Sequence, residues 1–242
     1  MANAPSASGR ATGRLSRRTL LAGMAAMAAA RPALADSASP VARGILANNP
    51  LALAFEDAPS RLPGVTLLGL DGKHSITEFR GRTILMPLWA EWCQPCLGEL
   101  SDFAKLQQKY SNSNFLVLPV LTGARKKLTP QIIGQLFGFL HANALAPMME
   151  DELTSHLMDT MAVRGAQEGA EIPCNLLIAP NGTVVGREFG LKSGNKDDSI
   201  APSPEGASLA ARAESGESLS LWGKAEGEQF AAAMAGGFLN EA

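Results

Sequence analysis

Two cysteines separated by two residues are the part of this sequence best suited to chemistry. Cys93 and Cys96 lie in the segment WCQPC, residues 92–96, where a predicted strand gives way to a predicted helix. Unpaired backbone N–H groups at a helix N-terminus stabilise an anion, so we expect the pKa of Cys93 to fall below the free value of about 8.5. On the first turn of a helix the second sulfur is close enough to form a disulfide. The pair therefore predicts thiol-disulfide exchange.

A static disulfide and a zinc site are the alternatives for the same pair. A bridge across two residues closes too small a loop to restrict the unfolded chain much. Zinc needs four ligands, and the chain has only three cysteines and three histidines, with no second C-x-x-C and no histidine pair at finger spacing. The residues favour exchange, and the two alternatives remain open at this point.

A β-α-β unit is predicted to position the cysteines. Residues 83–89 and 115–121 are nearly continuous apolar runs, as expected of strands buried on both faces of a sheet. Between them, apolar residues recur at helical spacing from Leu97 to Leu106, opposite charged residues. The first cysteine would then stand where the first strand meets the helix.

Further elements are predicted on both sides of this unit. A hairpin with an Asp-Gly turn is expected before it, and a second hairpin near the end of the chain. Residues 192–219 are rich in Ser, Gly, Ala, Pro and charge, which predicts a mobile surface insertion. The remaining expected elements are the hairpins 65–79 and 175–189, a helix from Thr129 carrying Ile132, Ile133, Leu136, Phe137 and Leu140 inward, a helix over 151–162, and a last helix over 225–239.

Residues 1–35 have the three-part pattern of an export signal. They hold five arginines and no acid, followed by an uncharged apolar stretch over 19–30 and by small residues before position 36. That stretch is shorter than the about 20 residues of a membrane-spanning helix, so no stable membrane span is expected. The pair Arg17-Arg18 resembles a twin-arginine signal. We expect cleavage near residue 35, a linker or first short helix over 36–50, and a periplasmic protein in an oxidising compartment.

The charge that remains after residue 35 argues against nucleic acid as a partner. Residues 36–242 carry 16 basic and 23 acidic side chains, whereas a phosphate backbone needs clustered positive charge. The one basic run, residues 125–127, is interpreted as a solvated turn.

Two motifs resemble the thioredoxin family. Residues 89–96 (WAEWCQPC) look like its active-site segment, and Ile172-Pro173 followed by residues 175–182 (NLLIAPNG) look like its cis-proline strand and hairpin. With the first hairpin and Glu99, the resemblance is closest to the exported TlpA/ResA-like thiol-disulfide oxidoreductases. It implies an α/β thioredoxin fold over 51–242, with a central mixed sheet flanked by helices, an N-terminal hairpin and an insertion before the last helix.

The resemblance also implies roles for single residues. Cys93 would be the attacking thiolate, Cys96 the resolving thiol, and Pro173 the cis proline beside the bound substrate. Glu99 would move the proton of Cys96, or would only stabilise the first turn of its helix. The residues expected to contact substrate are Trp92, Gln94, Pro95 and Ile172. No cofactor is expected, and the implied partners are disulfide-containing client proteins, of the kind matured for cytochrome c or copper centres, and a membrane thiol electron donor.

Two residues depart from the thioredoxin pattern. Pro87 stands where thioredoxins carry a buried acid, which predicts an irregularity in the central strand. Cys174 follows the expected cis proline, where Thr is usual. It is interpreted as a small buried residue, a third redox thiol, or part of a Cu(I) site with Cys93 and Cys96.

Two further functions are weighed on single features. A copper site could use the methionines and histidine between residues 148 and 161, although helical spacing explains Met158 and Met161 as core. A peroxidase of the peroxiredoxin type needs a Thr three residues before its cysteine, where Ala90 stands. We set the peroxidase aside. A Cu(I) chaperone with three sulfurs remains the alternative to the oxidoreductase.

Overall fold

The β-α-β unit predicted around the two cysteines is present. Strand β3 covers Thr83–Trp89, with all seven residues buried, and is followed by helix α3 over Gln94–Lys109. The second parallel strand is divided into β4, Phe115–Val117, and β5, Val120–Leu121. The cysteine segment therefore lies at the carboxyl end of a central strand.

The computed structural model describes residues 41–56, 58, 61, 62, 64–150, 157, 161, 172–189 and 220–240. All of them fall within one unit, residues 38–242. The predicted signal 1–35, the insertion 192–219 and most of the predicted helix 151–162 lie outside the described residues. Among the helices that are described, every one is too short or too polar to cross a lipid bilayer.

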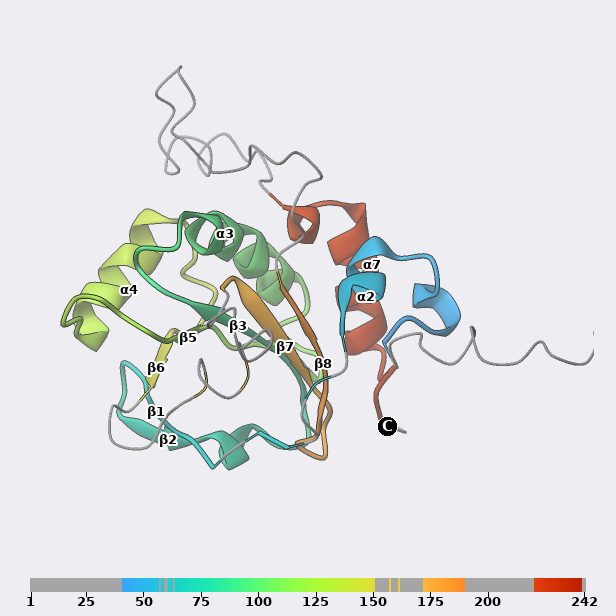
Figure 1. Cartoon of the computed structure of the whole chain (residues 1–242), viewed down its shortest axis with the longest axis horizontal. Helices are drawn as coiled ribbons and strands as arrows, with labels where there is room; N and C mark the ends of the chain where they lie inside the picture. Colours follow the sequence, from blue (N-terminus) through green and yellow to red (C-terminus); the bar gives the residue numbers. More distant parts are fainter. Residues whose placement is uncertain are drawn as a thin grey trace, which may run out of the picture. The chain divides into compact units, whose positions relative to one another are not determined.

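The strands form one mixed sheet in the order β2-β1-β6-β5-β3-β7-β8, with β4 also paired to β3 (Figure 1). Strand β3 runs parallel to β4 and β5 and antiparallel to β7. The other strands are β1 (Thr66–Leu68), β2 (Lys73–Ser75), β6 (Met148–Glu150), β7 (Cys174–Ile178) and β8 (Val184–Glu188), of which β2 and β8 end this order. Helices flank this sheet, and the arrangement is the thioredoxin fold expected from the resemblance.

A proline in the middle of β3 interrupts one of its two ladders. Pro87 has no N–H group to donate. On the parallel side β4 pairs with 83–85 and β5 with 88–89, so Pro87 falls in the gap between them. On the antiparallel side the register with β7 continues without a shift, and Pro87 lies opposite Asn175. The irregularity expected at Pro87 is present and is confined to one side of the strand.

The two faces of the sheet bury different residues, because successive side chains of a strand point to opposite faces. Leu85, Trp89 and Leu177 belong to a cluster that includes buried residues of α3, α4 (Pro130–Phe139) and α7 (Ala225–Ala235), which we call the α3-side core. Met86 and Leu88 belong to a second cluster, which we call the opposite core. Leu157 and Met161, the described residues of the predicted helix 151–162, are helical and buried in that opposite core.

The expected start of the domain at residue 51 is wrong. Val41 and Leu46 are fully buried in the α3-side core, and the short helices η1 (Gly44–Leu46) and α2 (Pro50–Ala54) follow one another. Asn49 caps α2, and its Nδ2 donates to the carbonyl oxygen of Glu226 in α7 at 2.9 Å. Figure 1 shows α2 beside α7. Residues 41–50 are therefore part of the folded domain, and of the two expectations for 36–50 the first short helix, not the linker, describes them.

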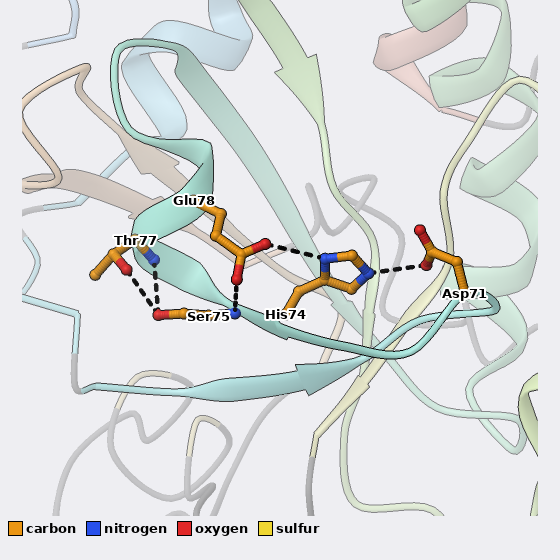
Figure 2. Close-up of polar contacts among 5 residues, drawn as sticks. All are labelled: Asp71, His74, Ser75, Thr77 and Glu78. Atoms are coloured by element: carbon orange, nitrogen blue, oxygen red, sulfur yellow. Dashed lines mark hydrogen bonds and ion pairs between the residues drawn. The ribbon is translucent and has the colours of Figure 1, made fainter.

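The second half of the first hairpin also differs from the expectation. After β2 the chain forms a 3-10 helix, η2, over Ile76–Phe79. Its N-terminus is a capping box, in which Ser75 accepts from Thr77 N–H and Glu78 accepts from Ser75 N–H (Figure 2). The S-x-x-E spacing is the local signal for this start. A further strand over 76–79 is therefore replaced by one helical turn.

Two predicted helices are confirmed with changed detail: α4 over Pro130–Phe139, and α7 over Ala225–Ala235, where a helix reaching residue 239 was expected. Helix α4 begins after Thr129, whose hydroxyl accepts from the Ile132 N–H at 3.3 Å. Ile133 and Phe137 are buried as expected, but the Ile132 side chain is 46% exposed, so its inward placement is wrong. The remaining 3-10 helix, η3 (Leu221–Gly223), precedes α7.

Candidate active site

The two cysteines of the C-x-x-C segment are joined in a disulfide, with their Cα atoms 5.3 Å apart. Cys93 is the N-cap of α3, and its Sγ accepts the Cys96 N–H at 3.3 Å. A backbone donor aimed at this sulfur, together with the dipole of a 16-residue helix, stabilises a thiolate here when the bond is reduced. The local arrangement that the sequence predicted is present, in its oxidised state.

The residues expected to contact substrate surround the disulfide. Cys93 and Cys96 are buried, Gln94 and Pro95 are exposed, and Trp92 is half-buried. The Ile172–Pro173 peptide is cis, and both residues are half-buried. Because Cys174 pairs with Leu88, Pro173 lies at the same end of the sheet as the disulfide. The structure therefore brings both motifs to one edge of the sheet, and the roles of their residues in binding remain proposals.

The loop that follows β5 lies against this segment. The Trp92 Nε1–H donates to the Gly123 carbonyl oxygen at 3.0 Å, and Glu91 Oε1 accepts the backbone N–H groups of Arg125 and Lys126 at 2.8 and 3.1 Å. The Arg125 guanidinium lies 4.2 Å from the centre of the Trp92 ring. The basic run is exposed, as a solvated turn would be, but it is also held beside the disulfide.

A group of polar side chains is buried between α3 and the sheet on the disulfide's side. Glu99 lies one turn after Cys96 in α3, so their side chains share one face of the helix. Asn175 of β7 lies opposite both Pro87 and Glu188 of β8, and its Nδ2 donates to Glu188 Oε2 at 2.6 Å. All three polar residues are at most 8% exposed. Pro87 stands where thioredoxins carry a buried acid. Near this position the chain has two other buried carboxyl groups, Glu99 on α3 and Glu188 on β8.

Burial controls the acidity of this group. Desolvation raises the pKa of Glu99 well above its ordinary value, and the charges of Glu188 and Asp102 raise it further. A hydrogen bond from Asn175 partly offsets the rise. Asp102 is itself fully buried, with Ser220 Oγ donating to it at 3.2 Å and Lys105 Nζ at 3.5 Å. Glu99 therefore holds a proton over a pH range in which an exposed glutamate has lost it.

The third cysteine is in a different environment. Cys174 belongs to the opposite core and is fully buried there, whereas Cys93 and Cys96 belong to the α3-side core. Desolvation, aided by the charge of Glu188, raises the pKa of the Cys174 thiol to about 12. Cys174 thus belongs to a different core from the other two cysteines, and of its three interpretations the small buried residue is the one that its complete burial supports.

The copper alternatives gain no support from the residues that the structure describes. Within that part of the chain no group of three or more His, Cys, Asp or Glu side chains is arranged to hold a metal ion. Met148 is buried in the opposite core at the start of β6. His156 and Met158 lie outside the described residues.

Sequence reasoning missed Asn175, Glu188 and the loop contacts of Glu91. The signal for the first two was a polar residue inside a buried strand and an acid at the end of another, which are unusual positions for unpaired polar groups. Their pairing depends on the register of β7 with β8, which periodicity does not reveal.

Comparison with known proteins identifies relatives. The AhpC/TSA family model matches residues 59–187. The chain is 35% identical over 65 residues to the thioredoxin-like protein YneN of Bacillus subtilis, covering 26% of this chain and 38% of that protein. It is 26% identical over 126 residues to the thiol-disulfide oxidoreductase ResA of Geobacillus kaustophilus, covering 52% and 65%. The chain thus spans less than two thirds of the length of either relative.

Among solved structures, a thiol:disulfide interchange protein of the thioredoxin family from Chlorobium tepidum matches with a TM-score of 0.43 and 20% identity, covering 55% of this chain and 86% of that one. The family match is the stronger finding, because residues 59–187 are more than half of the 242 residues and include Cys93, Cys96 and Pro173. The chain belongs to the AhpC/TSA family.

Proposed function

We propose that this protein is a periplasmic thiol-disulfide oxidoreductase that reduces disulfides in exported client proteins. The observation that carries the proposal is the Cys93 sulfur at the N-cap of α3, joined to Cys96 and accepting a backbone N–H. A sulfur so placed is a good leaving group and a stable thiolate, which are the properties that exchange requires. The names of the relatives agree with this chemistry.

The reaction consists of two exchanges. The Cys93 thiolate attacks one sulfur of the client disulfide, forms a mixed disulfide, and the other client sulfur leaves as a thiolate. Cys96 then loses its proton and attacks Cys93 Sγ, which closes the Cys93–Cys96 disulfide and releases the second client thiolate. Two electrons pass to the client, whose thiolates take up protons. A dithiol donor, proposed to be in the membrane, must reduce the bridge again.

The proton of Cys96 is proposed to pass to Glu99. Both side chains lie on one face of α3, one turn apart. A general base works best when its pKa is near the operating pH, and burial raises the pKa of Glu99 from its ordinary value in that direction. Glu188 and Asn175 act on Glu99 with opposite signs, and we propose that they are positioning residues that tune its pKa.

The client is proposed to bind across the edge formed by the two motifs. Ile172 and Pro173 would pair with its backbone, while Trp92, Gln94 and Pro95 would contact residues beside its cysteine. The half-buried and exposed positions of these five residues around a buried disulfide support this arrangement. The export signal pattern of residues 1–35 supports the periplasmic location, with cleavage near residue 35. Proteins of cytochrome c or copper-centre maturation are the proposed clients.

A single-turnover assay tests the proposal. Fully reduced protein is mixed with a peptide that contains one internal disulfide, and thiol release is followed in time. We expect wild type and Cys174→Ala to release peptide thiols at similar rates and Cys93→Ser to release none above buffer. Equal rates for Cys93→Ser and wild type would overturn the proposal, as would reduced protein that consumes hydrogen peroxide faster than it reduces the peptide.

A further inference from the structure

The strongest unexplained feature near the disulfide is its positive charge. Arg125, Lys126 and Lys127 are consecutive and exposed, in a chain whose residues 36–242 carry 16 basic and 23 acidic side chains. They lie in the loop after β5, which neighbours the loop after β3 because these two strands are adjacent and parallel. A basic run on an acidic protein therefore borders the candidate active site.

This loop is held in place before any partner arrives. Glu91 Oε1 accepts two of its backbone N–H groups, and Gly123 accepts the indole N–H of Trp92. At its start, Thr122 N–H donates to the Trp89 carbonyl oxygen at 2.9 Å. A loop whose backbone is already held by hydrogen bonds loses less conformational freedom when a partner binds. The backbone that carries the three cations is thus held beside the segment of Glu91 and Trp92.

The two lysines are available for a partner. The Arg125 side chain lies over the Trp92 ring. The Glu91 carboxylate offsets one of the three positive charges, and its Oε1 already accepts two backbone N–H groups of the loop. Neither Lys126 nor Lys127 forms an ion pair with any residue that the structure describes. Exposed charges of one sign next to a reactive group attract the opposite sign and raise the rate of productive encounter.

We infer that the loop 123–127 is a docking surface for an acidic polypeptide segment next to the disulfide of a client protein. This inference rests on the proposed reductase function and adds the chemistry of its substrate. Asp or Glu side chains that flank the client's cysteine would lie over Lys126 and Lys127 while that cysteine meets Cys93. The effect acts on encounter and binding, and the exchange step itself is unchanged.

The test uses the single-turnover assay with three peptides of equal length. Each contains the same internal disulfide, flanked by glutamates, by glutamines or by lysines. At low ionic strength we expect the wild type to reduce the glutamate peptide roughly three- to tenfold faster than the glutamine peptide, and the lysine peptide more slowly than either. This preference should fall as salt is added, because exposed charges are screened over about 8–10 Å.

Two double variants locate the effect. Lys126→Gln/Lys127→Gln should lose the preference for the glutamate peptide. Lys109→Gln/Lys224→Gln removes the same charge at the far end of α3, about 20 Å along the helix from Gln94, and at the start of α7, and should keep the preference. Equal loss in both double variants would mean that only net charge matters and would overturn the docking surface.

The remaining outcomes separate this inference from the function on which it rests. Equal rates for all three peptides, or a preference that survives Lys126→Gln/Lys127→Gln, overturn the docking surface and leave the reductase proposal standing. Failure of the wild type to reduce even the glutamine peptide overturns the proposed function itself.

Discussion

Cys93 and Cys174 lie in opposite environments in this fold. Cys93 lies at the N-terminus of α3 with a backbone N–H directed at its sulfur. Cys174, at the start of β7, is fully buried in the opposite core, where burial raises the pKa of its thiol to about 12. The position in the fold therefore places one cysteine sulfur at a helix N-terminus, which favours a thiolate, and the other in an apolar core, which disfavours one.

The two faces of the sheet differ in the same way. On the disulfide's side, the polar residues Glu99, Asn175 and Glu188 are buried beside the α3-side core, where buried charge is costly unless it is paired or neutralised. The opposite core surrounds Cys174 mainly with apolar side chains. The buried polar residues around Glu99 therefore lie on the face that carries α3, where the proposed proton transfer from Cys96 would take place.

The largest expected effect is on thiol reactivity. In reduced, folded protein at pH 7, iodoacetamide should alkylate Cys93 at least about a thousandfold faster than Cys174, because only the thiolate reacts and a thiol with a pKa near 12 is almost fully protonated. Mass spectrometry of the labelled peptides gives both rates. In guanidinium chloride the two rates should converge, and rapid labelling of Cys174 in folded protein would break the comparison.

The next effect concerns Glu99. Glu99→Gln should slow the collapse of the mixed disulfide by about ten- to a hundredfold, since Cys96 loses its proton acceptor. Stopped-flow measurement of the second exchange against pH should show a rate that rises through the raised pKa of Glu99 in wild type and loses this limb in the variant. If Glu99 only stabilises the first turn of α3, the free energy of unfolding will fall and the pH profile will not change.

The residues next to Glu99 should move that profile in opposite directions. Glu188→Gln removes a negative charge that raises the pKa of Glu99, so the rising limb should shift to lower pH. Asn175→Ala removes a hydrogen bond that lowers this pKa, so the limb should shift to higher pH. Shifts of the same sign in both variants would show that general loosening of the fold, and not charge, causes them.

The smallest effect is at the edge of the sheet, away from the disulfide. Both ring nitrogens of His74 lie against carboxylates, at 2.8 Å from Asp71 and 3.1 Å from Glu78 (Figure 2). These hydrogen bonds raise the pKa of His74 above its ordinary value of 6.5, so its stabilising contribution is complete below pH 6.5 and is lost as pH rises through the raised value.

Urea unfolding of wild type and His74→Gln against pH measures this contribution. The difference in the free energy of unfolding should be small, because these side chains face solvent, and should shrink toward alkaline pH. A difference that grows as pH rises would contradict the account of this hairpin. The rate of disulfide reduction should be the same in both proteins.

Local patterns predicted the part of the fold that carries the disulfide. Apolar runs and helical spacing gave β3 and α3 with their bounds nearly correct, and the C-x-x-C at their junction follows from them. Glu99 could be placed near Cys96 because residues three apart share a helix face. These features depend only on neighbours in the chain.

What the sequence left out depends on contacts between distant segments. Asn175 and Glu188 meet through the register of two strands, and Asn49 joins α2 to α7 across most of the chain. The basic run at 125–127 could not be placed beside Trp92 without knowing that β5 neighbours β3. Composition made residues 41–50 resemble a linker, and only packing shows that Val41 and Leu46 are core.

The most direct test of the central claim is to trap the exchange reaction. Reduced Cys96→Ser protein is mixed with a disulfide-containing client peptide, quenched with acid, digested without reducing agent, and analysed by mass spectrometry. The account predicts a stable mixed disulfide on Cys93 and none on Cys174. Attachment of the peptide to Cys174, or the absence of any adduct, would contradict it.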